Sequence, residues 1–420
     1  MWLQIGFVIA LSIILFVCLE SLAKYLLVRL SFAPKAEFPE IKPESIEKFD
    51  SFDSELGWER QPNEQRKKDT GHSSPNDPEA DRVTYSTDEY GSRICSKDRE
   101  SSGPNVATYG DSYCFCRDVQ DNETFQHYLS DELETHVSNY GVGNYGVDQA
   151  LLRLKRRFDD DPADYVVMAA LSHSIPRILS VWKHYSEFGN TFAVKPRFCF
   201  SGDCLEKIPC IANSREDILQ LEEQAEFLRS NDYHYENWFH PRRLYRPYTL
   251  RFCRNPANIP HALTSIANFA LDSVNIPITI PRDRWDHMRK MEQYEYHEQV
   301  IIECEDLYCE IIGEFVEFAC SRNAVPLYLP LFSGKYIEYE LEHGSIDQSI
   351  NDRLRSEYPR LHVLDTRYEI VGHIEDISEL YSGEGTNGHH SAMGNKLIGE
   401  SVAAKIRELE EQKGFVTLTD

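Results

Sequence analysis

The hydrophobic residues of the chain gather into short, continuous apolar runs separated by polar and helix-patterned stretches. Three such runs are 165–171 (YVVMAAL), 325–332 (VPLYLPLF) and 361–364 (LHVL). Apolar runs of this length, bounded by polar residues, are typical of strands in a parallel sheet that is covered on both faces. The second and third runs each follow a helical stretch, the longer of which extends from about 284 to 322. This alternation predicts a doubly wound α/β sheet.

The same rhythm begins at residue 105 and closes at the C-terminus. The run VATYG is strand-like, GDS follows it, and 123–137 has a helical pattern. A final helix is predicted over about 393–411, with its apolar positions facing inward. The stretch 186–280 is rich in proline and aromatic residues and breaks the alternation. We interpret it as an insertion into the α/β domain.

The N-terminus carries a second kind of apolar pattern. Residues 2–19 are uncharged and almost wholly apolar, which is just long enough to span a bilayer. A cleaved signal peptide would need basic residues before the run and small residues after it, and both are missing. We therefore predict a single-pass N-terminal membrane anchor. Lys24, Arg29 and Lys35 favour a cytoplasmic domain, whereas ten cysteines beyond the anchor suit an oxidising compartment, so the side of the membrane stays open.

These patterns divide the chain into three parts. The anchor is residues 1–30, an N-terminal extension is residues 31–104, and the α/β domain with its insertion is residues 105–420. Within the extension, 61–82 contains one alanine and no larger apolar side chain, so we expect an exposed, mobile loop there.

Composition excludes one class of partner. With 44 basic and 69 acidic residues the formal net charge is −25. Such a surface repels phosphate backbones, so we expect no nucleic-acid partner. The sequence also predicts no cofactor and no metal.

Three segments carry candidate chemistry. Gly110-Asp111-Ser112 follows the first strand of the α/β domain, and ligands of open α/β sheets bind beyond the carboxyl ends of the strands. The stretch 139–152 (NYGVGNYGVDQALL) places a glycine-rich turn before a helix, where backbone N–H groups can face a developing oxyanion. Two adjacent histidines, His389 and His390, precede the final helix.

In this order the segments resemble the SGNH, or GDSL, hydrolases, and in particular their membrane-anchored subgroup. The similarity rests on YGDSYCFCRDVQDNETFQHYLSDEL and the glycine-rich segment. It extends to the apolar N-terminus, SELGWERQPN, YGSR and WFHPRRLYRPY. The resemblance implies a flavodoxin-like three-layer α/β/α sandwich with a parallel sheet. It also implies an ester hydrolase acting on acyl groups of small molecules, carbohydrates or lipids.

Carried over to this chain, the resemblance makes Ser112 the nucleophile and His390 the general base, so we expect Ser112 Oγ and His390 Nε2 at hydrogen-bond distance. The family's Asp-x-x-His pattern then puts Asn387 where the carboxylate belongs. An amide in that position has cost about 10⁴ in turnover in a comparable triad. Glu384 is an alternative source of the acid.

The remaining site residues follow from the same comparison. The family's oxyanion donors correspond to the backbone N–H groups of Ser112 and Asn144, and to Ser174 in place of the usual asparagine. Asp111 and Arg177 are assigned to substrate binding. Because Asn144, Ser174 and Asn387 all depart from the family pattern, one alternative that stays open is a degenerate fold that binds a glycan or a partner protein. Another is an O-acyltransferase that uses the same serine.

Overall fold

The computed structural model describes residues 2–29, 34, 36–49, 51–69, 82–95, 103–202, 204–244, 246–274, 276, 278–281 and 283–417. The chain forms two compact units. Unit 1 comprises residues 1–46, 180–193 and 216–299, and unit 2 comprises 47–179, 194–215 and 300–420. The three-part division expected from the sequence stays a prediction.

Unit 1 is helical. Its first element, α1 (Trp2–Arg29), is long and apolar enough over Gln4–Arg29 to cross a membrane, a test that signal sequences also pass. The other helices in and next to this unit are α2 (Pro43–Glu47), α5 (Ala225–Asn231), α6 (His240–Arg242), α7 (Tyr248–Cys253), α8 (Asn258–Ser273) and the first part of α9 (Asp283–Ser321). Short turns of helix occur at η3 (Lys183–Tyr185), η4 (Arg215–Gln224) and η5 (Tyr235–Phe239).

Unit 2 is built on a five-stranded parallel sheet in the order β11-β10-β7-β5-β6. Its strands are β5 (Val106–Gly110), β6 (Val137–Asn139), β7 (Tyr165–Leu171), β10 (Val325–Leu331) and β11 (His362–Val363). Numbered within the sheet, this is the order 2-1-3-4-5 of flavodoxin-like folds. The expected fold class is therefore confirmed, and the three apolar runs seen in the sequence are its strands β7, β10 and β11.

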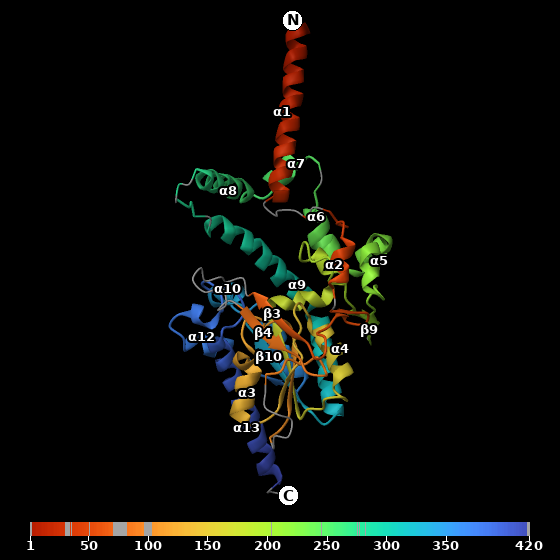
Figure 1. The fold of residues 1–420 in the computed structure, drawn as a ribbon, viewed down its shortest axis with the longest axis vertical. Coiled ribbons are helices and arrows are strands. Elements are labelled where there is room, and N and C mark those ends of the chain that lie inside the picture. Colours follow the sequence, from red (N-terminus) through yellow and green to blue (C-terminus); the bar gives the residue numbers. More distant parts are fainter. Residues whose placement is uncertain are drawn as a thin grey trace. The chain divides into compact units, whose positions relative to one another are not determined.

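Helices cover both faces of the sheet, which gives the three layers seen in Figure 1. On one face lie α3 (Phe125–Leu133) and α13 (Ala392–Thr417), and on the other lie α4 (Val147–Arg157) and the second part of α9. Alternate strand residues, such as Val167 and Leu329, join the first core together with Val402 of α13. On the second face, Tyr308 of α9 meets Tyr328 of β10 with their hydroxyls 2.9 Å apart. Period-two alternation along the strands explains this division.

The remaining elements of unit 2 surround this sandwich. Antiparallel pairs are β1 (Phe52–Asp53) with β2 (Gly57–Trp58), β3 (Gln65–Asp69) with β4 (Arg82–Ser86), and β8 (Arg197–Ser201) with β9 (Cys204–Ile208). The helical elements are η1 (Asp121–Glu123), η2 (Ser172–Leu179), α10 (Gly334–His343), α11 (Gln348–Glu357), α12 (Arg367–Gly372) and η6 (Ile377–Leu380).

The expectation of a loop over 61–82 is wrong in part. Residues 65–69 form β3 and pair in register with β4, because backbone hydrogen bonds to a neighbouring strand stabilise even a polar segment at a sheet edge. Residues 70–81 lie outside the described part of the chain. All eleven cysteines are free in the structure.

Candidate active site

Ser112 lies at the carboxyl end of β5, in a tight turn where only glycine fits before it. A Cβ on Gly110 would lie 2.1 Å from the carbonyl oxygen of Ala169 on the neighbouring strand, so that position excludes any side chain. Asp111 closes the turn, because its Oδ1 accepts the Tyr113 N–H at 2.9 Å. The Ser112 side chain is thereby fixed at the edge of the sheet where this class of fold binds ligands.

A histidine and a carboxylate stand in line with Ser112. The Nε2 atom of His389 lies 2.8 Å from Ser112 Oγ, and its Nδ1 atom lies 2.9 Å from Asp118 Oδ2. Asp118 is nearly buried, with 5% of its side chain exposed, and His389 keeps 16% exposed. The three side chains therefore form one continuous chain of hydrogen bonds.

The expected contact between Ser112 and His390 is wrong. His390 is buried, and its Nε2 donates to the carbonyl of Phe332 at 2.7 Å. Burial lowers the pKa of His390 to about 3 from its usual 6.5, so this ring is neutral at physiological pH. His390 thus ties the histidine loop to the end of β10, while its neighbour His389 faces the serine.

The expected position of the acid is also wrong. Asn387 is exposed, and its amide donates to the backbone carbonyl of Glu384 at 2.7 Å. With His389 facing Ser112, the family's acid position three residues earlier falls on Thr386, which bonds Glu338 instead. The carboxylate beside the ring comes from Asp118, six residues after the serine, because the turn following β5 folds back under the histidine loop.

Asp118 is held by several partners. It accepts the backbone N–H of His389 at 3.1 Å and the Ser382 hydroxyl at 3.2 Å, both on its Oδ2 atom. Its own loop is braced by Arg93, which is 1% exposed. This guanidinium donates to the carbonyls of Phe115, Cys116 and Val119 at 2.6 to 2.8 Å and pairs with Asp121. Arg93 belongs to the YGSR segment, so that motif fixes the loop carrying Asp118.

Tyr113 links the serine turn to the histidine loop. Its hydroxyl donates to the carbonyl of Gly388 at 2.9 Å. Its ring lies 4.4 Å, centroid to centroid, from the ring of His389 and 4.9 Å edge-on from that of His390. The residue after the serine therefore positions both imidazoles.

The glycine-rich turn lies against Ser112. A Cβ built on Gly143 would be 3.9 Å from the Ser112 Cβ, which is ordinary contact, and Asn144 has a φ of +70°. Trp58 donates its indole N–H to the carbonyl of Gly143 at 2.9 Å. Since the peptide is trans, the N–H of Asn144 points away from Trp58. A left-handed residue and an indole donor thus set the direction of this peptide.

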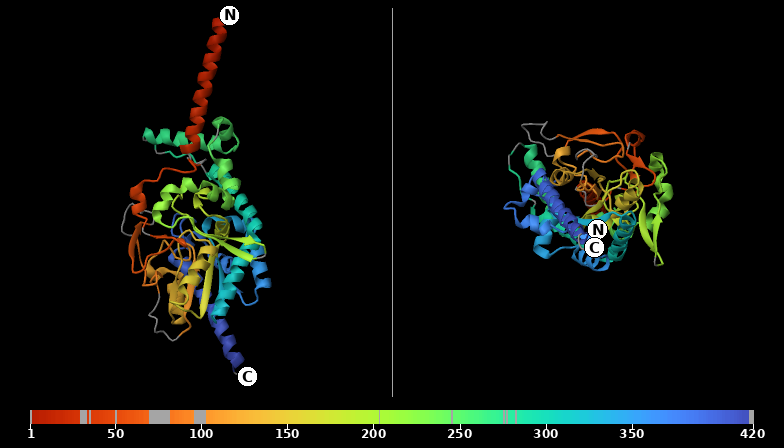
Figure 2. Two further views of the ribbon diagram at one scale, coloured as in Figure 1. Left: turned by 90° about the vertical axis from the view of Figure 1, so that its right-hand side faces the viewer. Right: turned by 90° about the horizontal axis from the view of Figure 1, so that it is seen from below.

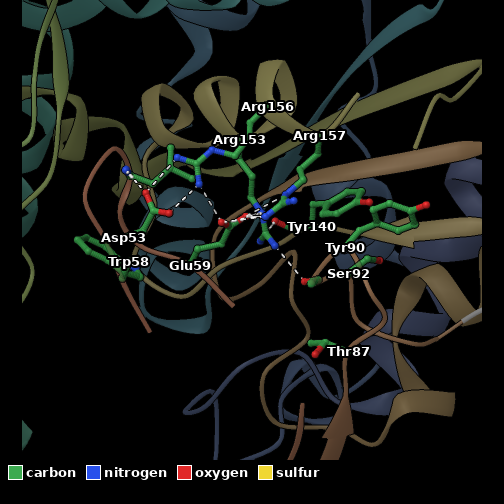
Figure 3. A network of polar contacts seen from close by, with 12 residues as sticks. Asp53, Trp58, Glu59, Thr87, Tyr90, Ser92, Tyr140, Arg153, Arg156 and Arg157 are labelled. Atoms are coloured by element: carbon green, nitrogen blue, oxygen red, sulfur yellow. Dashed lines mark hydrogen bonds and ion pairs between the residues drawn. The ribbon is translucent and has the colours of Figure 1, made fainter. Parts of the chain in front are cut away.

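Trp58 is anchored by an ion cluster next to it in the sequence. Glu59 faces three arginines of α4, and Figure 3 shows their guanidinium groups converging on it. The separations are 3.1 Å to Arg153, 2.9 Å to Arg156 and 3.1 Å to Arg157. Because the Glu59 side chain is only 7% exposed, these pairs are well shielded from water. The SELGWER segment is thereby fixed on α4 with its indole at the glycine turn.

Ser174 and Asp111 do not face the position expected of them. The Ser174 hydroxyl donates to the carbonyl of Leu171 at 2.8 Å, so its single proton is used there and cannot reach an oxyanion. Asp111 is 2% exposed and pairs with Arg177 at 3.1 Å, which removes it from contact with a substrate. Arg177 also donates to the carbonyl of Tyr145 at 3.0 Å and stays partly exposed, so its contact with a substrate stays a prediction.

No protein-family model matches the chain, and no curated protein matches it. One solved structure that matches is a lipolytic protein of the G-D-S-L family from Desulfitobacterium hafniense (13% identity, 72% of this chain and 98% of that chain, TM-score 0.30). Another is the psychrotrophic esterase EstA from Pseudoalteromonas (10%, 73% and 99%, 0.33). A third is an acetyl-xylooligosaccharide esterase from Geobacillus (12%, 74% and 96%, 0.32).

Similarities at identities this low concern the fold alone. They do not identify the reaction, for which the residues of this chain are the only basis. Within the described residues, no group of three or more His, Cys, Asp or Glu side chains is placed to hold a metal ion. Sequence reasoning missed Asp118, Arg93 and Trp58. The available signal was that each belongs to a segment of the resemblance, GDSYCFCRD, YGSR and SELGWER.

Proposed function

We propose that the protein is a serine ester hydrolase with Ser112 as nucleophile, His389 as general base and Asp118 as the carboxylate that orients the base. The observation that carries this proposal is the line of hydrogen bonds from Ser112 Oγ through His389 to Asp118, with separations of 2.8 and 2.9 Å. Nucleophile, base and orienting acid at these distances are the geometric definition of a catalytic triad.

The hydrogen bonds assign the protons. A carboxylate only accepts, so His389 Nδ1 carries the hydrogen toward Asp118, and Nε2 has a free lone pair for the Ser112 hydroxyl. As Ser112 Oγ bonds to an acyl carbonyl carbon, its proton moves to Nε2 and the carbonyl oxygen becomes an oxyanion. The imidazolium then protonates the departing alcohol as the ester bond breaks. Water, activated by the same ring, releases the acid and restores Ser112.

The oxyanion would be met by two backbone donors, the N–H groups of Ser112 and Asn144. The bond from Trp58 to the Gly143 carbonyl supports this role, since it turns the next N–H away from the indole. Backbone donors need no particular side chain, so asparagine at position 144 is compatible with the function, and its positive φ directs the peptide.

The substrate class that fits is an acyl ester on a small molecule, a carbohydrate or a lipid, handled by a chain whose α1 anchors it in a membrane. The binding-only alternative rests on the departures at Asn144, Ser174 and Asn387 together, and the carboxylate of Asp118 beside His389 offsets the one at Asn387. An O-acyltransferase would use the same serine and differ only in passing the acyl group to an alcohol. Product analysis with a sugar acceptor separates transfer from hydrolysis.

The deciding experiment is labelling of the full chain with a fluorophosphonate, which reacts with activated serines. The wild type and the His390→Gln variant should label, whereas Ser112→Ala and His389→Gln should not. Hydrolysis of an activated acetyl ester should follow the same order. Equal labelling of His389→Gln and wild type would refute the assignment of the base, and an unlabelled wild type with intact folding would refute the hydrolase itself.

A further inference from the structure

Exposed apolar side chains follow one face of α8 and the segment after it. On the helix they are Ile259, Leu263, Ile266 and Phe269, the last 75% exposed. Spacings of four, three and three residues place them on one side of an α-helix. Past the helix the exposed apolar residues are Val274, Ile276, Ile278 and Ile280. Soluble surfaces rarely carry so continuous an apolar strip, which marks it as an interaction surface.

This strip is attached to α1 within unit 1. Ala262 of α8 and Phe252 of α7 pack with Ala23, Leu26 and Leu27 near the C-terminal end of α1. Figures 1 and 2 show α8 lying across the direction of α1 in both side views. The apolar helix therefore runs across the candidate membrane-spanning helix, close to the C-terminal end of α1.

Glu20 fixes the level of this attachment. Its carboxylate accepts the backbone N–H groups of Tyr248 at 2.7 Å and Thr249 at 2.8 Å, which begin α7. Glu20 is also the first charged residue after the uncharged run of α1. The α7–α8 segment thus meets α1 where its apolar stretch stops.

The rise of an α-helix gives the distance of these residues from the end of the uncharged run of α1. Ala23 and Leu27 lie about 6 and 12 Å beyond Leu19 along the axis of α1, at about 1.5 Å per residue. The headgroup layer outside the hydrocarbon core is about 5 to 8 Å thick on each side. If α1 spans the bilayer with its uncharged run, α8 lies at the level of the headgroups, parallel to the membrane plane.

Charge on the same segment is opposite to that of the whole chain. Residues 238–281 contain five arginines and one aspartate, a net of +4 in a chain of −25. Arg242, Arg251 and Arg254 line a hollow of about 360 Å³ together with Pro241, Asn255 and Pro256. Guanidinium groups match the geometry of phosphate oxygens, and basic segments beside a membrane are attracted to anionic lipids.

We propose that α8 and the segment to Ile280 are a second membrane contact, embedded in the headgroup layer of the bilayer that α1 spans. The exposed apolar face meets the acyl chains, and the arginine-lined hollow takes the phosphate of an anionic lipid. This inference rests on the membrane-anchoring part of the proposed function and is independent of the esterase chemistry.

The test places the full chain in phosphatidylcholine vesicles. It measures how strongly brominated acyl chains quench the fluorescence of a tryptophan reporter. Phe269→Trp adds a reporter on the apolar face, and Ile94→Trp adds a control reporter at another exposed apolar position, in unit 2. The native tryptophans contribute the same background to both. Quenching should be roughly twofold greater for Phe269→Trp, because an interfacial helix buries its apolar face among the upper acyl carbons.

Equal quenching in the two variants would overturn the proposal. Alkaline extraction distinguishes the anchor from the second contact: a chain that stays with the vesicles but shows no extra quenching retains its anchor and lacks the second contact. Nanodiscs that hold a single chain distinguish contact with lipid from contact with a second copy of the protein. If Phe269→Trp is quenched by lipid only when no second chain is present, the strip is a dimer surface and the proposal fails.

The arginine hollow is tested by adding phosphatidylglycerol to the vesicles. Quenching of the Phe269→Trp reporter should rise, and Arg254→Gln should abolish that rise, whereas Arg360→Gln, an exposed arginine of unit 2, should leave it intact. Inorganic phosphate added to neutral vesicles should not reproduce it. A rise that survives Arg254→Gln, or one produced by free phosphate, would overturn the headgroup assignment.

Discussion

His389 and His390 are neighbours in the chain, yet their rings serve different partners. His389 points its Nε2 at Ser112 Oγ, 2.8 Å away, and His390 points its Nε2 at the carbonyl of Phe332, 2.7 Å away. The proposed base and a buried structural hydrogen-bond donor are therefore adjacent residues. Substituting each histidine in turn can test activity and stability separately.

Replacing each histidine by glutamine should give opposite outcomes. His389→Gln removes the only imidazole in contact with Ser112 among the described residues, so kcat for ester hydrolysis should fall by about 10⁴ with little change in Tm. His390→Gln should retain most activity and lower Tm, because a buried hydrogen bond worth about 1 kcal/mol is disturbed. Steady-state kinetics and thermal unfolding of both variants measure the split. Loss of activity in a folded His390→Gln variant alone would contradict it.

Asp118→Asn should lower kcat by about 10⁴, because an amide cannot both hold the Nδ1–H tautomer and stabilise the imidazolium. The matched change is Asn387→Asp, which adds a carboxylate at an exposed position and should leave kcat near the wild-type value. Michaelis–Menten kinetics at one pH compare the two. A gain of activity in Asn387→Asp would indicate that the orienting carboxylate belongs at position 387 and would contradict the role of Asp118.

The stability of the fold should acquire a pH dependence from His390. In the unfolded chain its pKa is 6.5, and burial lowers it to about 3 in the fold. The unfolded state therefore binds a proton below pH 6.5 that the folded state refuses, and stability falls as the pH falls through this window. The slope from this group is at most about 1.4 kcal/mol per pH unit. Denaturant unfolding at several pH values should give a shallower slope for His390→Gln, and identical slopes would show that His390 titrates normally.

Arg93→Met should disturb the active site from a distance. The change leaves three carbonyls around Asp118 without their donor and Asp121 without its partner, at a cost of about 3 kcal/mol. We expect a lower Tm and a fall in kcat larger than any change in KM, since the loop carrying Asp118 relaxes. Arg93→Lys, which keeps the charge, should recover part of both losses. A variant with normal kcat and lowered Tm would limit Arg93 to stability.

Trp58→Phe keeps an aromatic side chain, although a smaller one, and removes the indole N–H that bonds the Gly143 carbonyl. If this bond directs the Asn144 N–H toward the oxyanion, kcat should fall by roughly tenfold or more, because a misdirected oxyanion donor is largely lost. Stability should change by only about 1 kcal/mol. Tyr85→Phe is a suitable control, since it also removes one hydrogen bond to a side chain of the same unit, from Arg60. Equal kinetics in the two variants would exclude the proposed role of Trp58.

The sequence by itself predicted the central strands of the sheet and Ser112 as the proposed nucleophile. Continuous apolar runs predicted β7 and β10 nearly to the residue, because a strand buried on both faces rarely admits polar side chains, and a third run located the short, half-buried β11. Gly110 before Ser112 marked the turn, because the backbone of the next strand leaves no room for a Cβ. The order of the motifs along the chain then indicated the two loops that meet at Ser112 and His389 in the structure.

Only the tertiary structure decided which side chains of those loops meet. Adjacent residues in extended backbone point to opposite sides, so the choice between His389 and His390 depends on how their loop crosses the sheet edge. Asp118 reaches His389 across 271 positions of sequence, through a loop that Arg93 braces by its backbone carbonyls. Every residue type has the same backbone carbonyl, so the amino-acid sequence does not indicate which carbonyls Arg93 contacts. Asp118 could therefore be recognised as the proposed acid only in the folded chain.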